Sequence, residues 1–283
     1  MQATSSLATR FASNAHTLRS ALPLAEHEMR LAAPSIFAAG KHASRSERYT
    51  YIPTIEVLRG LRAEGFEPFM VAQGKSRIAG KADYTKHMIR MRHAGQVTAR
   101  PEANEIILIN SHDGASSYQM LAGVLRFVCC NGLVVGDIAH DIRIPHKGDV
   151  RDEVIEGAFR VLDDFERVDA SIAEMKAVSL DAGEERALAT AALALRYGEG
   201  DDVRATAPIT AEQLTEARRS DDVGASLWLV TNRLQENLQR GGQPGRSTQG
   251  RRIRTRAVKS IDRSVSLNRA LWVLAEEMRR LKA

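Results

Sequence analysis

The sequence predicts an α+β protein with a small antiparallel sheet core backed by helices, followed by a mostly helical C-terminal half. Two short apolar runs, Ile106–Ile109 and Val124–Val135, flank a polar turn that contains Asp113-Gly114. Runs of this kind are typical of buried strands, and Asp-Gly is a strong turn signal. Beyond residue 151 the apolar spacing becomes helical. Strands first and helices later argue against an alternating doubly wound fold.

Three regions follow from this pattern. Residues 1–20 are mixed in composition and are expected to form a flexible N-terminal arm. Residues 21–150 form the predicted α+β core, and residues 151–283 form a helical C-terminal region with a basic loop over 240–263.

The elements of the core are predicted from apolar spacing and turn residues. Thr54 is a good N-cap for a helix over residues 55–64, which Gly65 ends. Residues 83–92 alternate between apolar and polar, which indicates a half-exposed strand. Asn131-Gly132 predicts a second break in the chain before the next apolar residues. The other expected elements are a helix over residues 25–32 and strands over 49–52 and 69–73.

The C-terminal region reads as helices with one glycine-rich loop. Apolar residues recur near helical spacing through a long segment, residues 152–177, with acids on the outside. The remaining expectations are helices over 182–197, 210–219, 223–239 and 266–282, and a flexible loop over 241–247.

Charge is concentrated in particular segments. Net charge is only +5, but the stretch from Arg240 to Arg263 contains one acid, Asp262. Its basic residues are Arg240, Arg246, Arg251, Arg252, Arg254, Arg256, Lys259 and Arg263. This pattern is typical of a polyanion binder, and it fits poorly with a solvated face of mixed charge.

The two cysteines, Cys129 and Cys130, are adjacent. Adjacent strand residues point to opposite faces, which disfavours a disulfide between them. We expect free, buried thiols in a reducing cytoplasm. No apolar run reaches transmembrane length, so a cytoplasmic protein without membrane partners is expected.

Several motifs resemble the domain-of-unknown-function family 932, whose members are carried by plasmids, phages and integrated elements. The central ones are Asn110-Ser111-His112-Asp113-Gly114, Gly123-Val124-Leu125-Arg126 and Cys130-Asn131-Gly132-Leu133. Further matches lie at residues 46–54, 87–92, 232–237 and 267–272. The resemblance implies a mobile-element context, and the family's name supplies no mechanism.

The favoured function is nucleic-acid binding without ATP, with single-stranded DNA as the favoured partner and a homo-oligomer as the expected assembly. On an extended strand Lys86, Arg90 and Arg92 share a face with Tyr84, so bases could stack where cations follow phosphates. The alternative for this strand is a charged edge that keeps the sheet soluble. A basic strand and loop on a sheet backed by helices are also broadly similar to phage single-strand annealing proteins. The candidate contact residues are Tyr84, Lys86, Arg90, Arg92, Arg126, Arg246, Arg251, Arg252, Arg254, Arg256 and Lys259.

The alternative function is a metal-dependent nuclease or phosphoesterase that uses His87, His112 and Asp113. The competing interpretation is that Asn110, His112 and Asp113 hydrogen-bond a tight turn. A third possible function, ranked below these two, is that of an accessory protein that counters a host defence component. No phosphate-binding loop or nucleophile elbow is present. We therefore predict no catalytic residues, no metal and no cofactor, and a structural role for Asn110, His112, Asp113, Gly114, Asn131 and Gly132.

A final group of polar residues lies just before Arg240. Asn232, Gln235, Glu236 and Asn237 fall on one predicted helix, where amides could contact nucleic acid or a partner subunit. The expected alternative is the solvent-facing end of an amphipathic helix.

Overall fold

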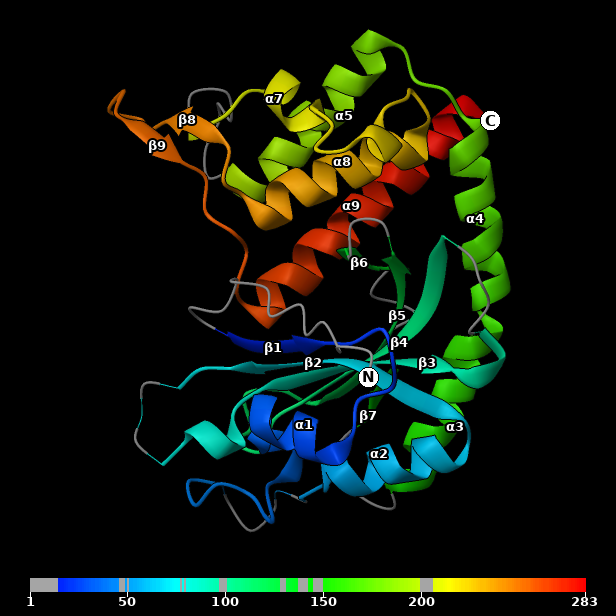
Figure 1. Ribbon diagram of the computed structural model, residues 1–283, viewed down its shortest axis with the longest axis vertical. Coiled ribbons are helices and arrows are strands. Elements are labelled where there is room, and N and C mark those ends of the chain that lie inside the picture. Colours follow the sequence, from blue (N-terminus) through cyan, green and yellow to red (C-terminus); the bar gives the residue numbers. More distant parts are fainter. Residues whose placement is uncertain are drawn as a thin grey trace, which may run out of the picture. The chain divides into compact units, whose positions relative to one another are not determined.

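The computed structural model describes residues 15–45, 49, 51–76, 78, 80–96, 101–127, 131–136, 142–144, 150–198 and 206–283 (Figure 1). The chain divides into two units. The first comprises residues 1–125, 138–165 and 259–261, and the second comprises residues 126–137, 166–258 and 262–283.

The first unit is built on an antiparallel sheet. Its strand order is β1-β2-β3-β4-β5, and β7 also pairs with β5. Apolar residues that alternate along β3 and β4 supply one face of this sheet, which fixes the register of the pair (for example Ile89 opposite Leu108). The strands are β1 (Ala15–Arg19), β2 (Phe66–Gly74), β3 (His87–His93), β4 (Glu102–Asn110), β5 (Tyr118–Arg126) and β7 (Ile142–Ile144).

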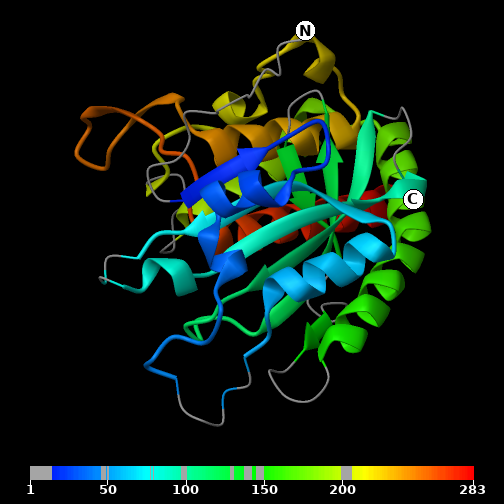
Figure 2. The same cartoon turned by 60° about the horizontal axis from the view of Figure 1, so that its bottom comes forward.

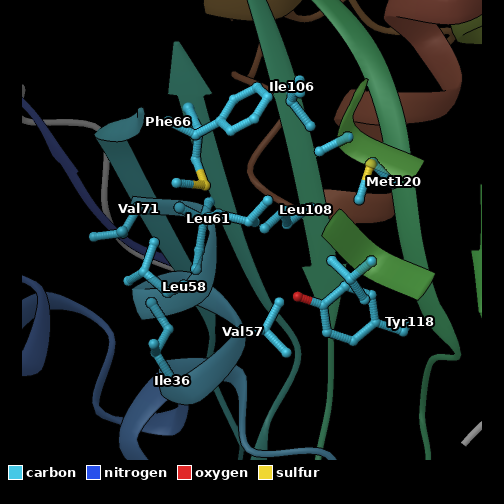
Figure 3. Packing of buried hydrophobic residues seen from close by; sticks show 14 of the residues in the cluster. Ile36, Val57, Leu58, Leu61, Phe66, Val71, Ile106, Leu108, Tyr118 and Met120 are labelled. Atoms are coloured by element: carbon cyan, nitrogen blue, oxygen red, sulfur yellow. The ribbon is translucent and has the colours of Figure 1, made fainter. Parts of the chain in front are cut away.

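Helices α1 (Glu26–Ala32), α2 (Thr54–Ala63) and α3 (Val150–Asp163) cover one face of the sheet. Leu58 and Leu61 of α2 belong to the same buried cluster as Val71 and Leu108 of the strands (Figure 3). Each such side chain contributes about 1.5–3 kcal/mol when fully buried. The short 3-10 helices of this unit are η1 (Pro34–Phe37), η2 (Ala82–Tyr84) and η3 (Ala94–Gln96).

The second unit is mostly helical. Asp181 caps α5 by accepting from the Glu184 amide, and Ser226 caps α8 by accepting from the Leu229 amide. The elements are β6 (Asn131–Val134), α4 (Phe165–Ala177), α5 (Ala182–Tyr197), α7 (Ala211–Thr215), η5 (Ser220–Asp222), α8 (Leu227–Arg240), β8 (Pro244–Arg246), β9 (Arg252–Arg254) and α9 (Ile261–Lys282).

The polar residues at the end of α8 are buried, so the expectation of a solvent-facing helix end was wrong. Gln235 Nε2 donates to Asn268 Oδ1 of α9 at 2.6 Å, and Asn237 Nδ2 donates to the Leu214 carbonyl at 2.7 Å. Glu236 forms ion pairs with Arg219 and Arg240. These side chains therefore join parts of the second unit to each other, because buried amides and charges need internal partners.

The predicted α+β class is confirmed, with strands at both central apolar runs and a helix over residues 182–197. Thr54 is the first residue of α2 rather than its cap, and Pro53 occupies the N-cap position. The predicted long helix is two helices that meet at Asp164, and Asn131-Gly132 begins β6 rather than forming a break.

Three further expectations were corrected. Tyr49 and residues 51–53 adopt no strand, and residues 83–92 split into η2 and a buried β3 instead of one half-exposed strand. The expected flexible loop over 241–247 contains β8.

Some expectations fall on other parts of the chain. Residues 15–19 of the segment predicted as a flexible arm form β1, which pairs with β2. Residues 1–14 lie outside the described residues, and so do Cys129 and Cys130. Among the helices of the described residues, none is long and apolar enough to cross a bilayer.

Candidate nucleic-acid interface

Strands β8 and β9 form an antiparallel hairpin in the second unit, and we call residues 244–256 the basic hairpin. Its register pairs Arg246 with Arg252 and Pro244 with Arg254. The connecting turn is closed by the Ser247 amide, which donates to the Arg251 carbonyl at 2.9 Å, and Gly250 adopts a φ of 75°. A glycine suits this turn because L side chains rarely adopt a positive φ. In Figures 1 and 2 the hairpin extends beyond α7 and α8 of its own unit.

The five arginines of the basic hairpin are exposed to solvent. Across the described residues, none of them forms an ion pair. The polar contacts that their side chains make are to backbone carbonyls: Arg254 Nη1 donates to Gly242 at 2.8 Å, and Arg246 Nη1 donates to Gly250 at 3.2 Å. The structure thus brings together Arg246, Arg251, Arg252, Arg254 and Arg256. Lys259 is half-buried and belongs to the first unit, so it is not part of this group.

Arg90 and Arg92 occupy a different environment from the one predicted. They do share one face of β3, but Glu105 of β4 holds both guanidinium groups, at 2.5 Å from Arg90 Nε and 2.9 Å from Arg92 Nη2. A buried charge is tolerated only with a charged or hydrogen-bonding partner. These arginines therefore neutralise the buried carboxylate of Glu105 in the interior of the protein. The expectation that they contact nucleic acid is corrected accordingly.

Arg126 is also removed from the expected contact residues. It is buried and forms an ion pair with Asp222, which also pairs with Arg219 Nε at 3.1 Å. All three residues belong to the second unit, so both ion pairs lie within it.

Tyr84 and Lys86 lie in the first unit, beside β3 rather than within it. Tyr84 ends η2, and its ring meets the His42 ring edge to face at 5.2 Å between centroids. Both residues are half-buried. The ring is therefore already in aromatic contact, and the shared strand face that was predicted for Tyr84 does not form.

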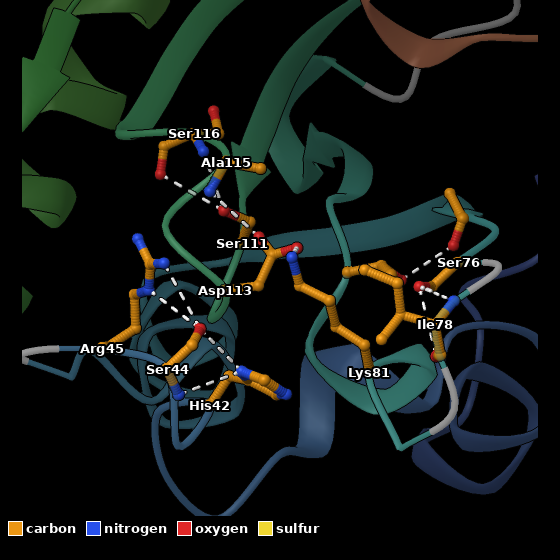
Figure 4. A network of polar contacts seen from close by, with 12 residues as sticks. His42, Ser44, Arg45, Ser76, Ile78, Lys81, Ser111, Asp113, Ala115 and Ser116 are labelled. Atoms are coloured by element: carbon orange, nitrogen blue, oxygen red, sulfur yellow. Dashed lines mark hydrogen bonds and ion pairs between the residues drawn. The ribbon is translucent and has the colours of Figure 1, made fainter.

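The turn after β4 is held by its own side chains (Figure 4). Ser111 Oγ accepts from the Ser116 amide at 2.8 Å, and Asp113 Oδ1 accepts from the Ala115 amide at 2.9 Å. Asp113 also pairs with Lys81 at 3.3 Å. Gly114 has a φ of 74°, and a Cβ there would come within 2.5 Å of Arg45 Nη1. The family-like motif thus forms a compact turn in which short polar side chains satisfy backbone groups.

His112 of this turn and His87 of β3 belong to a buried polar cluster. Their ring centroids are 5.3 Å apart, and Thr54 Oγ1 lies 3.0 Å from His87 Nε2 and 3.4 Å from His112 Nε2. Two further contacts complete the cluster: Ser35 Oγ lies 3.0 Å from His87 Nδ1, and Asn110 Nδ2 donates to Thr54 Oγ1. Burial, with a smaller contribution from the charge of His112, lowers the pKa of His87 to about 3.

This cluster is not arranged as a metal site. Both ring nitrogens of His87 face hydroxyl groups, and Asp113 directs its carboxylate to Lys81 and to the backbone. No group of three or more His, Cys, Asp or Glu side chains able to hold a metal ion occurs among the described residues. Within the described part of the chain, His87, His112 and Asp113 therefore do not form a group that could hold a metal ion.

Two charged residues were missed by sequence reasoning. Glu105 stands directly before an apolar run, and a buried acid at such a place requires a basic partner. That signal was present in the sequence. Arg186 of α5 lies beside the basic hairpin and lines the same cavity as Arg246, although they are far apart in the chain. Only the fold reveals this proximity.

Comparison with known proteins places the chain in a family. The family model described as "Domain of unknown function (DUF932)" matches residues 41–272. The chain is similar to two Escherichia coli (strain K12) proteins, UPF0380 protein YafZ and UPF0380 protein YfjQ. Each is 48% identical over 272 residues, covering 96% of this chain and 97% of the relative. No solved structure matches the chain. The protein therefore belongs to the domain of unknown function family DUF932.

Proposed function

We propose that this protein binds nucleic acid, with single-stranded DNA favoured, through the basic hairpin and without ATP. The observation that carries the proposal is the group of five exposed arginines on one hairpin, none in an ion pair within the described part of the chain. Arginine suits this task because its planar guanidinium group offers several donors to phosphate oxygens.

The register of the hairpin strengthens the proposal. Arg246 and Arg252 are directly opposite each other, and Arg254 lies on the same face two residues along β9. Like charges at opposed positions destabilise a hairpin. A phosphate bound between the two guanidinium groups would remove this repulsion and release the counterions of the strand. The arrangement is therefore more favourable with a polyanion bound than without one.

The proposal extends to the biological setting that the family resemblance implies. Binding without sequence preference suits the pairing of complementary strands during recombination in plasmids and phages, and self-assembly into a homo-oligomer would place several hairpins along one strand.

A binding assay tests the proposal. Fluorescence anisotropy with labelled single-stranded DNA in chelator compares the wild type with Arg252→Glu/Arg254→Glu. Arg160→Glu/Arg280→Glu serves as the control, because it makes the same charge change at exposed positions outside the hairpin. We expect the hairpin variant to lose at least about tenfold in affinity and the control to lose less than about threefold. Equal losses in both variants would contradict the proposal.

The same protein preparation also tests the nuclease alternative. Labelled DNA incubated with magnesium or manganese is examined on a denaturing gel. We expect retarded but intact DNA. Shortening of the strand that disappears in His112→Ala would favour metal-dependent cleavage instead.

A further inference from the structure

The second unit contains a cavity of about 1150 Å³ between α5, the start of α7 and the basic hairpin. Three arginines line it: Arg186 from α5, and Arg246 and Arg252 from the hairpin. All three are exposed, and within the described residues none of them forms an ion pair. The acid in the lining is Glu212. The balance of charge along this wall favours an anionic ligand.

Aliphatic side chains form another part of the wall. Ile253 is 39% exposed, and Ala207 and Pro208 are half-buried, while Leu193 and Ile209 lie beneath them at 3% and 5% exposed. A ligand that fits this cavity therefore combines negative charge with apolar surface. Nucleotides have this combination, because phosphates alternate with sugars and bases along the strand.

Backbone and amide contacts fix the two sides of the cavity to each other. The Arg246 amide donates to the Pro208 carbonyl at 2.9 Å, and Gln213 Nε2 donates to the Pro244 carbonyl at 3.0 Å. A Cβ at Gly245 would come within 2.2 Å of the Pro208 carbonyl oxygen, so this glycine permits the close approach. The cavity is therefore formed before any ligand arrives, which lowers the entropic cost of binding.

We infer that this cavity seats an unpaired segment of the bound strand. Its phosphates lie on Arg186, Arg246 and Arg252. Its sugars and bases lie against Ile253, Ala207 and Pro208. The volume exceeds the upper end of the roughly 300–1,000 Å³ found for small-molecule sites, so it suits more than one nucleotide. This inference rests on the proposed function and adds a cause for strand preference, because bases stacked in a duplex cannot enter the cavity.

The test fills the cavity without changing its charge. The variants are Thr190→Trp on α5 and Ala211→Trp on α7, and both positions line the cavity. Binding of labelled oligothymidylate is compared with binding of a duplex of equal length, and circular dichroism melting confirms that each variant folds. We expect either tryptophan to weaken single-strand binding about tenfold while duplex binding changes less than about twofold. Arg186→Gln should act in the same direction. Arg251→Gln, a hairpin arginine outside the cavity lining, should weaken both substrates alike.

The outcomes separate this inference from the proposed function. If both folded tryptophan variants keep the wild-type preference for single strands while Arg252→Glu/Arg254→Glu loses affinity, the inference is wrong and the proposed function stands. If the hairpin variant binds DNA as the wild type does, the proposed function itself is wrong. A third assay adds free thymidine monophosphate. If it binds the wild type and not Thr190→Trp while oligothymidylate binds neither protein, the cavity is a small-nucleotide site, and the inference is overturned.

Discussion

Arg246 and Arg252 are paired directly opposite each other on β8 and β9, and neither has an acidic partner among the described residues. Like charges at opposed positions of a hairpin lower the stability of the free protein. Under the proposed function, a bound phosphate would contact both guanidinium groups. A charge arrangement of this kind is expected where a ligand supplies the missing counter-charge.

Replacing one member of this pair should therefore increase stability and weaken binding. We predict that Arg252→Thr raises the free energy of unfolding by about 0.2–1 kcal/mol, because it removes the opposed like charge and adds a strand-forming residue. Urea unfolding measures this change. Arg251→Thr is the matched control, since Arg251 lies outside the paired strand positions, and it should give no such gain. A clear loss of stability in Arg252→Thr would show that the pair is not repulsive.

Removing a partner from the buried ion pairs of the first unit should lower stability. Glu105→Gln leaves Arg90 and Arg92 without their carboxylate, and we expect a loss of about 3–5 kcal/mol because uncompensated buried charges are costly. Glu56→Gln removes an exposed partner of Arg59 and should change stability by less than about 0.5 kcal/mol. Denaturant unfolding of both variants decides the point, and similar effects in the two would refute an interior role for Arg90 and Arg92.

Gly123 leaves room for the same ion pairs. A Cβ at this position of β5 would lie 2.7 Å from Ile107 Cδ1 and 2.8 Å from Arg90 Nη2. Gly123→Ala should therefore destabilise the protein by about 1–3 kcal/mol through overpacking. Gly40→Ala is the control, because no atom lies within 4 Å of a Cβ there. It should be neutral or slightly stabilising in the same thermal or urea measurement.

The buried histidine cluster predicts a pH dependence. The pKa of His87 is lowered from 6.5 to about 3 in the folded protein. Below about pH 6.5 the unfolded chain binds a proton that the folded protein excludes, so this contribution to stability is complete above that pH. It is lost as the pH falls toward 3.

Comparison with a variant isolates this contribution. Between about pH 6 and pH 4.5, the wild type should lose about 1.4 kcal/mol per pH unit more than His87→Gln does. Urea unfolding across this range measures the difference. Parallel pH profiles for the two proteins would show that His87 titrates normally when folded.

The helices were the most predictable part of the fold. Residues 182–197 were predicted as one helix, which the structure shows within the same bounds, because Asp181 provides a capping box and the Ala/Leu-rich sequence favours a helix. The break at Asp164 was missed because neither glycine nor proline marks it. Thr54 was misassigned because its hydroxyl bonds His87 and Asn110 rather than capping α2, a contact that depends on tertiary structure.

The charges of the arginines could be predicted from the sequence, but their partners in the fold could not. The excess of arginine over residues 240–263 was visible directly, and so was its suitability for phosphate. For Arg90, alternation along a strand correctly placed it on one face with Arg92, but the partner on the neighbouring strand depends on strand register. Register also determines that Arg246 faces Arg252. A sequence shows the sign of a charge, whereas its neutralisation is a property of the fold.

The salt dependence of single-strand binding tests the central claim most directly. If all five hairpin arginines contact phosphates, the slope of log affinity against log salt concentration should be about −3.5, and Arg252→Gln/Arg254→Gln should make it shallower by about 1.4. The measurement is anisotropy with oligothymidylate between about 50 mM and about 200 mM salt, where the wild type should lose about 100-fold in affinity. A slope that is the same in the wild type and in the double variant would contradict the claim that these arginines bind the strand.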